Sequence, residues 1–455
     1  MSGSVAMKIL VRGGRVVDPA SGRDEVADVA IAADRIVAIG DGTSGRLRDF
    51  AAEQVIDAGG LVVMPGLVDL AARLREPGHE HEGMLESELA AAAAGGVTSL
   101  VCPPDTDPVL DEPGLVEMLK FRARKISRCR VFPLGALTRG LEGAALTEMA
   151  ELTAAGCIGF SQADTPVRDT QVLMRALQYA ATFGYLVWLR PQDPWLGGGV
   201  AASGAMATRL GLSGVPVAAE TIALAQIIEL VRATGARVHL QRLSSAAGVA
   251  LVRAAKAEGL PITADVSINS LHLTDVDIGF FNADMRLTPP LRQGADRDAL
   301  RAALADGTID ALVSDHNPVA EDMKNLPFAE AEPGATGLEL LLSLALRWGR
   351  DTKLPLARTL ACVTSAPVRV LGDSIGSLAS SAGRLTEGGV ADLCLFDPND
   401  DWAVTPARLV SQGKHTPFSY TGTGMAMSGR VRMTLVAGTL AHDAGRAGGA
   451  GAAAR

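Results

Sequence analysis

Cysteine is scarce and scattered in this sequence. The 455 residues include five cysteines, and no two of them form a Cys-x-x-Cys pair. Zinc ribbons and disulfide frameworks both depend on closely spaced cysteines, so the sequence argues against both classes. Separated thiols suit a reducing compartment, and we expect a cytoplasmic protein.

Long apolar runs and clustered positive charge are also missing. No uninterrupted apolar stretch approaches the roughly 20 residues of a membrane-spanning helix, and the first eight residues lack the charged-then-apolar layout of a signal peptide. The net charge is -9 at pH 7. A negative chain without a basic stripe does not suit a nucleic-acid partner.

Two kinds of apolar pattern are present. From Lys8 to about Val63, and again after Leu385, short strand-like runs are separated by turns. From Pro65 to about Gly372, short apolar strands alternate with alanine-rich helical segments. The alternation predicts a parallel (β/α) barrel, and the returning strand pattern predicts that both chain ends complete one small β domain. We expect a composite β-sandwich domain over 1–64 and 385–445, a barrel over 65–384 and a flexible Gly/Ala tail over 446–455.

Several motifs occur in an order that indicates one family. They include Pro65-Gly66-Leu67-Val68-Asp69, Arg75-Glu76-Pro77-Gly78, Gly135-Ala136-Leu137-Thr138-Arg139-Gly140, Thr288-Pro289-Pro290-Leu291-Arg292 and Ser314-Asp315-His316. Together they resemble bacterial dihydroorotase of the amidohydrolase superfamily. The resemblance implies an α/β fold, a (β/α)8 TIM barrel with a β-sandwich domain formed by both chain ends. It also implies a reaction in which zinc-bound hydroxide attacks the ring amide of dihydroorotate.

The resemblance fails where the family binds its metal. The family has His-x-His after its first barrel strand, and the corresponding residues here are Ala71 and Arg73. Later ligand positions of the family are occupied by Arg190, Arg242 and Asn269. A methyl group and a guanidinium cannot coordinate zinc. We therefore expect no cofactor here, with zinc confined to active relatives.

A few functional positions of the family keep a related residue. Asp315 matches an aspartate that is a metal ligand and proton shuttle in the family, and Arg75 matches the arginine that holds the substrate carboxylate. The family's substrate-binding asparagines are replaced by Asp105 and Thr288, and a one-residue shift would keep Asp164 as a ligand aspartate. We interpret Asp315 as a vestigial catalytic residue and Arg75, Asp105 and Thr288 as vestigial substrate-binding residues. Arg75 can equally be structural.

Arg73, Arg190 and Arg242 are all expected to project toward the barrel mouth. Each would repel a divalent ion at ~4 Å by several kcal/mol at an effective dielectric constant of ~20. Buried arginines need acidic partners. We expect an arginine–aspartate network in place of the metal, with the partners Asp69, Asp105, Asp164 and Asp315. A small anion held by the arginines is an open alternative.

A second His-x-His is formed by His79 and His81, so a metal site displaced to these two residues is an open alternative.

Two functions follow from these observations. In the first, the chain is similar to the inactive pseudo-dihydroorotases of some bacteria, which bind the catalytic subunit of aspartate transcarbamoylase in pyrimidine (UMP) biosynthesis. The resemblance then implies a non-catalytic assembly subunit and a homo-oligomer, such as a dimer, within a larger complex. In the second, the chain is an active cyclic amidohydrolase of the dihydroorotase, hydantoinase or allantoinase type. It would use a residual metal or a metal-free site with Asp315, Arg75 and His316.

Overall fold

The computed structural model describes residues 7–43, 45–419 and 426–447. The tail predicted over 446–455 lies outside the described residues from 448 onward. None of the helices in the described ranges has the length and apolar character needed to cross a bilayer.

Parallel strands form the barrel wall. They are β6 (Leu67–Asp69), β7 (Val97–Cys102), β8 (Arg130–Pro133), β9 (Gly135–Ala136), β10 (Phe160–Ser161), β11 (Leu186–Leu189), β14 (Arg237–Leu240), β15 (Ile262–Ser267) and β16 (Ala311–Val313). They pair as β6-β7-β8 and as β9-β10-β11-β14-β15-β16. Leu134, between β8 and β9, donates its backbone N–H to Cys102 and so continues the strand across the break. A parallel bridge between Ala72 and His316 closes the ring on the other side.

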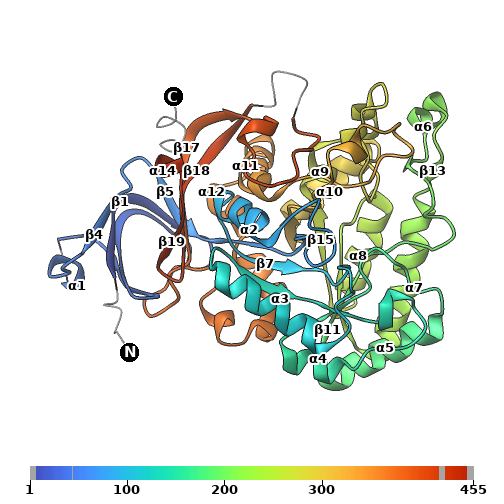
Figure 1. The fold of residues 1–455 in the computed structure, drawn as a ribbon, viewed down its shortest axis with the longest axis horizontal. Helices are drawn as coiled ribbons and strands as arrows, with labels where there is room; N and C mark the ends of the chain where they lie inside the picture. Colours follow the sequence, from blue (N-terminus) through green and yellow to red (C-terminus); the bar gives the residue numbers. More distant parts are fainter. Residues whose placement is uncertain (1–6, 44, 420–425, 448–455) are drawn as a thin grey trace.

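Helices cover the outside of the barrel (Figure 1). In α5 (Thr170–Phe183), Leu173, Ala176, Leu177 and Ala180 are buried at helical spacing, so one face packs on the barrel. The helix begins where the Asp169 side chain accepts the backbone N–H of Gln171, and it ends at Gly184 with φ of 73°. The other covering helices are α2 (Leu85–Ala94), α3 (Pro113–Ile126), α4 (Met149–Ala155), α7 (Ala218–Thr234), α8 (Ala246–Ala257), α10 (Gly294–Asp306), α11 (Leu341–Asp351), α12 (Leu356–Ala361) and α13 (Ser365–Leu371).

Short elements lie in the connecting segments. They are α1 (Gly45–Arg48), α6 (Ala205–Leu210), α9 (Ile268–His272), α14 (Ala444–Ala447), β12 (Ala201–Ala202), β13 (Gly214–Val215) and the 3-10 helices η1 (Arg139–Leu141), η2 (Asp275–Ile278), η3 (Ala283–Met285), η4 (Asp322–Lys324), η5 (Leu338–Leu340), η6 (Gly372–Ser380) and η7 (Pro406–Arg408).

Strands from both chain ends pair in one further sheet. They are β1 (Lys8–Asp18), β2 (Arg23–Ala32), β3 (Arg35–Gly40), β4 (Gln54–Asp57), β5 (Val62–Pro65), β17 (Leu393–Ala403), β18 (Ala426–Val436) and β19 (Thr439–Asp443). The order is β19-β18-β17-β5-β1-β2-β3, with β4 on β1. β17 runs antiparallel to β5, with Leu395 opposite Val63. Both side chains are fully buried in the aliphatic core of this β domain.

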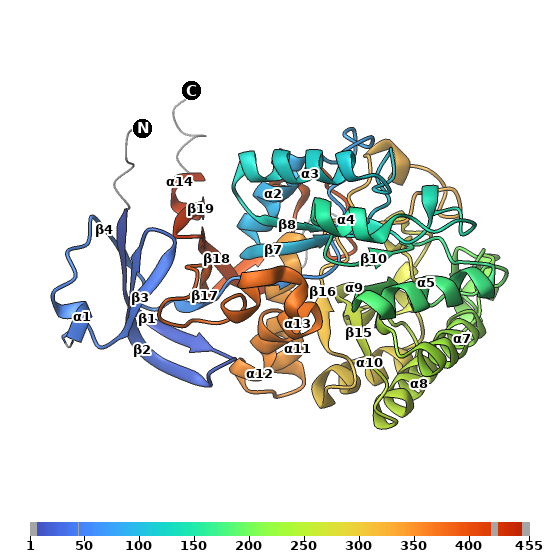
Figure 2. The same cartoon turned by 90° about the horizontal axis from the view of Figure 1, so that it is seen from below.

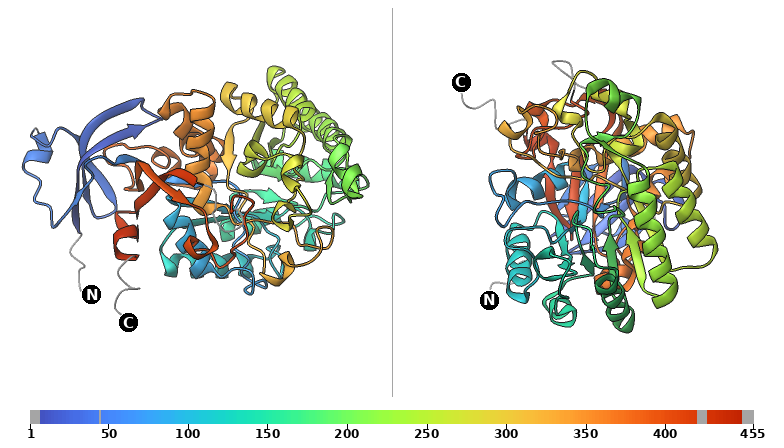
Figure 3. Two further views of the ribbon diagram at one scale, coloured as in Figure 1. Left: turned by 90° about the horizontal axis from the view of Figure 1, so that it is seen from above. Right: turned by 90° about the vertical axis from the view of Figure 1, so that its right-hand side faces the viewer.

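The β domain lies at one end of the molecule and the barrel at the other (Figures 2 and 3). Arg130 at the start of β8 pairs with Asp392 just before β17, which ties the barrel to the β domain. The fold class predicted from the sequence, a barrel with a β domain built from both chain ends, is confirmed.

Candidate functional site

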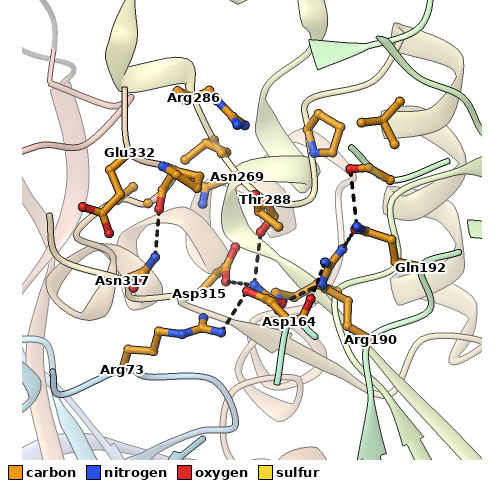
Figure 4. Close-up of a pocket in the computed structure, with 18 of the residues that line it drawn as sticks. Arg73, Asp164, Arg190, Gln192, Asn269, Arg286, Thr288, Asp315, Asn317 and Glu332 are labelled. Carbon is orange, nitrogen blue, oxygen red and sulfur yellow. Dashed lines mark hydrogen bonds and ion pairs between the residues drawn. The ribbon is translucent and has the colours of Figure 1, made fainter. Parts of the chain in front are cut away.

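A cavity of about 430 Å³ opens at the barrel mouth, where the carboxyl ends of the strands converge (Figure 4). Parallel strands bring residues that are far apart in sequence to this one edge. Residues that follow β6, β7, β10, β11, β14, β15 and β16 all contribute to its wall, namely Arg73, Asp105, Asp164, Arg190, Arg242, Asn269 and Asp315.

Asp164 is the centre of the charged groups at this mouth. Its Oδ2 accepts a hydrogen bond from Arg73 Nη2 at 2.9 Å, and its Oδ1 accepts one from Arg190 Nε at 2.6 Å. Arg242 Nη2 also pairs with Oδ1. Three guanidiniums from three different strand ends therefore share one carboxylate.

Two further aspartates complete this group. Arg73 Nε donates to Asp105 Oδ2 at 2.8 Å, and Arg242 Nη1 donates to Asp315 Oδ1 at 3.1 Å. Arg73, Arg190 and Arg242 with Asp105, Asp164 and Asp315 are called the arginine–aspartate cluster below. Their arrangement is the one expected from the need of buried guanidiniums for acidic partners.

The charges in the cluster shift one another's pKa values. Burial alone would raise the pKa of Asp164, but the positive charges of Arg242, Arg73 and Arg190 outweigh burial and hold it well below its usual range. Burial raises the pKa of Asp315, and Arg242 and Arg73 offset only part of that effect. Asp164 is therefore the charged carboxylate on which the guanidiniums depend most.

The backbone turns sharply at the strand ends that carry the cluster. Ala163, Arg242 and Asp315 have φ values of 49°, 54° and 51°, a left-handed conformation that residues other than glycine rarely adopt. A buried contact holds the turn at Arg242, because its backbone N–H donates to Asp265 Oδ1 at 2.6 Å. Asp265 is held in turn by His239 Nε2 at 2.9 Å.

The residues of this mouth do not fit a zinc ion. Oxygens of Asp164 and Asp315 that could act as ligands accept hydrogen bonds from guanidiniums, and the position of Arg73 brings a positive charge to the centre. Across the described ranges, no three His, Cys, Asp or Glu side chains are arranged to hold a metal ion. The donor chemistry of the site is that of an ion-pair cluster.

Arg75 is committed to two carboxylates. Its Nη2 donates to Glu332 Oε1 at 3.0 Å, and its Nε pairs with the buried Glu82. The Arg75 side chain is 10% exposed. The group that holds the substrate carboxylate in the family is thus already neutralised here by the protein's own acids.

The prediction that Asp69 pairs with the arginines is wrong. Asp69 is fully buried, and its Oδ1 accepts the backbone N–H of Ser314 at 3.0 Å while Oδ2 accepts the Ser314 hydroxyl. It therefore joins β6 to the end of β16. Ala71 lies beside this contact, since its carbonyl oxygen accepts the backbone N–H of His316 at 3.2 Å.

The other predicted site residues divide between the cavity and its surroundings. Thr288 lines the cavity and accepts Arg242 Nη1 through its carbonyl oxygen at 3.1 Å. His316 is buried, and its Nε2 lies 2.8 Å from Glu88 Oε2, so it does not line the cavity. His79 and His81 also lie outside the cavity lining, with their ring centroids 6.2 Å apart.

Several cavity residues were not anticipated. Gln192, Arg286, Asn317 and Glu332 line the cavity from the loops that follow β11, β15 and β16. Their positions depend on how long loops fold back over the mouth, which strand periodicity does not encode. Glu332 lies in the segment Pro318 to Gly334 that follows β16, and neither a strand end nor a motif marks its position.

Comparisons with known proteins agree with this architecture. The model of the Dihydro-orotase-like family matches residues 60–247, and the model of the Amidohydrolase family matches residues 173–441. A dihydroorotase-like protein of Pseudomonas aeruginosa is 45% identical over 438 residues, covering 96% of this chain and 100% of that protein. A dihydroorotase of Geobacter sp. is 38% identical over 440 residues, covering 96% and 100%.

A solved structure shows the same fold. The L-hydantoinase (dihydropyrimidinase) from Arthrobacter aurescens matches with a TM-score of 0.83 at 25% identity, and the match covers 96% of each chain. The relatives match nearly the whole chain, and the Amidohydrolase model matches more than half of it. The chain therefore belongs to the amidohydrolase family, within its dihydroorotase-like group.

Proposed function

We propose that this chain is a non-catalytic dihydroorotase homologue that serves as an assembly subunit for aspartate transcarbamoylase in de novo pyrimidine biosynthesis. The observation that carries the proposal is the arginine–aspartate cluster. Arg73, Arg190 and Arg242 share the carboxylate of Asp164 where the resemblance implies metal ligands.

The contacts of the cluster speak against ring-amide hydrolysis. A metal-bound hydroxide supplies both the nucleophile and much of the stabilisation of the developing oxyanion in such a reaction. Asp315, interpreted above as vestigial, accepts a hydrogen bond from Arg242, and His316 contacts Glu88 away from the cavity. An active cyclic amidohydrolase, the alternative function, would have to use side chains that already form hydrogen bonds or ion pairs within the protein.

The proposed assembly role follows from the resemblance to pseudo-dihydroorotases. A structural subunit needs an intact fold but no catalytic groups, and this chain keeps the complete barrel while its mouth is cross-linked by ion pairs. The proposed partner is the catalytic subunit of aspartate transcarbamoylase, which this chain would bind as a dimer within a larger cytoplasmic complex.

The test combines three measurements on the purified chain. Metal content, dihydroorotase turnover and mass by light scattering are recorded for the chain alone and after mixing with aspartate transcarbamoylase from the same organism. We expect no stoichiometric zinc, no turnover and a joint complex heavier than either protein. The 38% identical Geobacter dihydroorotase serves as the positive control for turnover. Stoichiometric zinc with turnover contradicts the non-catalytic part, and two unmixed species contradict the assembly part.

A further inference from the structure

A second cavity lies at the end of the barrel opposite to the mouth. It has a volume of about 520 Å³, and residues of α3, β8, η6, the segment between α4 and β10, and the turn between β18 and β19 line it. Arg130 is the first residue of β8 and Ile158 precedes β10, so the cavity lies at the amino ends of these strands. Figure 2 shows α3 and α4 side by side, and α3 packs against β8. The barrel and the β domain both contribute to the wall, and ligand cavities often form at such boundaries.

The interior of this cavity is apolar and open to a ligand. Five of its lining residues each keep 5–9% of their surface exposed, namely Val131, Cys157, Ile158, Ile375 and Val436. The ring of Phe132 is also only partly buried. Val101 and Leu134, in the same wall of the barrel but outside the cavity lining, are fully buried. The lining side chains therefore have apolar surface that an apolar ligand would cover, which is favourable.

The interior offers no free charge. Burial raises the pKa of Cys157 to about 12, and burial also raises the pKa of Cys129, so both remain neutral thiols at pH 7. Arg130 lines the cavity as well, but it pairs with Asp392. The part of a ligand that enters this interior should therefore be uncharged.

Two cations on α3 lie at the rim of the cavity. Lys120 Nζ donates to the backbone carbonyl oxygens of Ala155 and Gly156, both at 3.4 Å, and Arg124 Nε donates to the Lys120 carbonyl oxygen at 3.3 Å. These distances are long for charged donors. Within the described part of the chain, neither side chain forms an ion pair with a carboxylate. Glu117 lines the adjoining surface groove but not this cavity. Both cations can therefore donate to an anion at the rim.

We propose that this cavity binds an aliphatic monocarboxylate of medium chain length. The carboxylate would accept hydrogen bonds from Lys120 Nζ and from the Arg124 guanidinium. The alkyl chain would lie against the apolar side chains of β8, η6 and β18. A volume of about 520 Å³ is within the range of cavities that hold small ligands. The uncharged interior disfavours a ligand with charged groups at both ends.

This site is separate from the arginine–aspartate cluster, because the two cavities share no lining residue. The proposal holds whether or not the chain assembles with a transcarbamoylase.

The test compares three probes on the full-length chain. Octanoate carries both the carboxylate and the alkyl chain, 1-octanol has the chain without the charge, and acetate has the charge without the chain. Binding is measured by calorimetry for the wild type, Lys120→Gln, Arg124→Gln and Lys125→Gln. Lys125→Gln is the matched control, because Lys125 is exposed on the same helix and does not line the cavity.

We expect octanoate to bind the wild type and K125Q equally and to bind K120Q at least about tenfold more weakly. R124Q should bind octanoate about two- to fivefold more weakly, because the exposed guanidinium is partly screened by water. Since Arg124 is exposed, this loss would not come from unfolding. In the wild type, 1-octanol and acetate should each bind at least about tenfold more weakly than octanoate.

The position of the chain is checked with 8-bromooctanoate in a crystal of the complex. The anomalous signal of bromine should lie beside Phe132 and Ile375. No binding of octanoate, equal binding to both K120Q and R124Q, equal binding of 1-octanol or of acetate, or bromine outside this cavity would each overturn the proposal.

Discussion

Arg190 Nε donates a hydrogen bond of 2.6 Å to Asp164 Oδ1, and this contact joins the ends of the adjacent strands β10 and β11. The same oxygen also pairs with Arg242, which follows β14. One carboxylate thus connects three consecutive strands of the barrel wall. The mouth is fixed by electrostatic contacts at the positions where the resemblance implies metal ligands.

Replacing Asp164 by Asn should destabilise the chain strongly. The substitution leaves Arg190 without its carboxylate and weakens the pairing of Arg73 and Arg242, and breaking a buried ion-pair network by removing one partner costs about 3–5 kcal/mol. The free energy of unfolding is measured by urea denaturation. Asp306→Asn, which breaks the exposed pair with Arg253, is the control and should cost less than about 1 kcal/mol. Equal losses in the two variants would show that the cluster does not stabilise the mouth.

Replacing Arg75 by Gln should also destabilise the fold. Glu82 and Glu332 both lose their partner, and Glu82 is 5% exposed. We expect a loss of about 2–4 kcal/mol in the free energy of unfolding. The control is Arg15→Gln, because Arg15 and Asp24 form an exposed pair. If the free energy of unfolding falls no more than in the control, the structural role of Arg75 is contradicted and a ligand-binding role is favoured.

Asp69 should make stability depend on pH between about 4 and 6. Burial raises the pKa of Asp69 to about 6, above its value near 4 in an unfolded chain. The folded state therefore binds this proton more tightly. The resulting stabilisation is complete below about pH 4 and is lost as the pH rises through about 6.

The measurement is the free energy of unfolding against pH for the wild type, Asp69→Asn and Asp24→Asn. D69N should lack the fall that the wild type shows over this interval. D24N should keep it, because the pKa of Asp24 is lowered by its hydrogen bond from Arg15. A D69N profile parallel to that of the wild type would contradict the assignment.

Removal of metals should leave the chain unchanged. A ligand that binds only the folded state raises Tm, so loss of a resident zinc would lower it. Because Arg73 and Arg242 occupy the mouth, we expect Tm to change by less than about 1 °C after dialysis against a chelator and after zinc is added back. Scanning fluorimetry with metal analysis by mass spectrometry gives the answer. A clear fall in Tm on chelation would contradict this prediction and favour a displaced metal site at His79 and His81.

The sequence predicted the barrel well because its strands are short, apolar and regularly spaced. Val97–Cys102 and Leu186–Leu189 are fully buried strands, which an apolar run between turns indicates directly. The β domain was predicted from strand patterns at both ends, although the short strand β4 and the terminal strand β19 were not identified. Short or half-exposed strands carry too few residues for a period-2 pattern to be seen.

The site was predicted only where a strand end determines the position of a side chain. Arg73, Arg190 and Arg242 lie at the mouth because each follows a parallel strand. The prediction for Asp69 was wrong for a physical reason. The backbone N–H and the hydroxyl of Ser314 donate to its two carboxylate oxygens, so the buried carboxylate does not require an arginine partner. Arg286 could not be predicted, since its place depends on a loop fold.

Three guanidiniums on one carboxylate also restrict how this mouth can change by mutation. Substituting histidine for Arg73 alone would leave Asp105 without its arginine partner. Arg190 and Arg242 would still repel an incoming cation. Each replacement would favour metal binding only after the other arginines had been replaced. The effects of the single substitutions are therefore strongly non-additive. An intermediate on a path from this mouth to a zinc centre would carry buried charges without partners and would be less stable than the present chain. The ion pairs therefore oppose the stepwise replacement of the cluster by metal ligands.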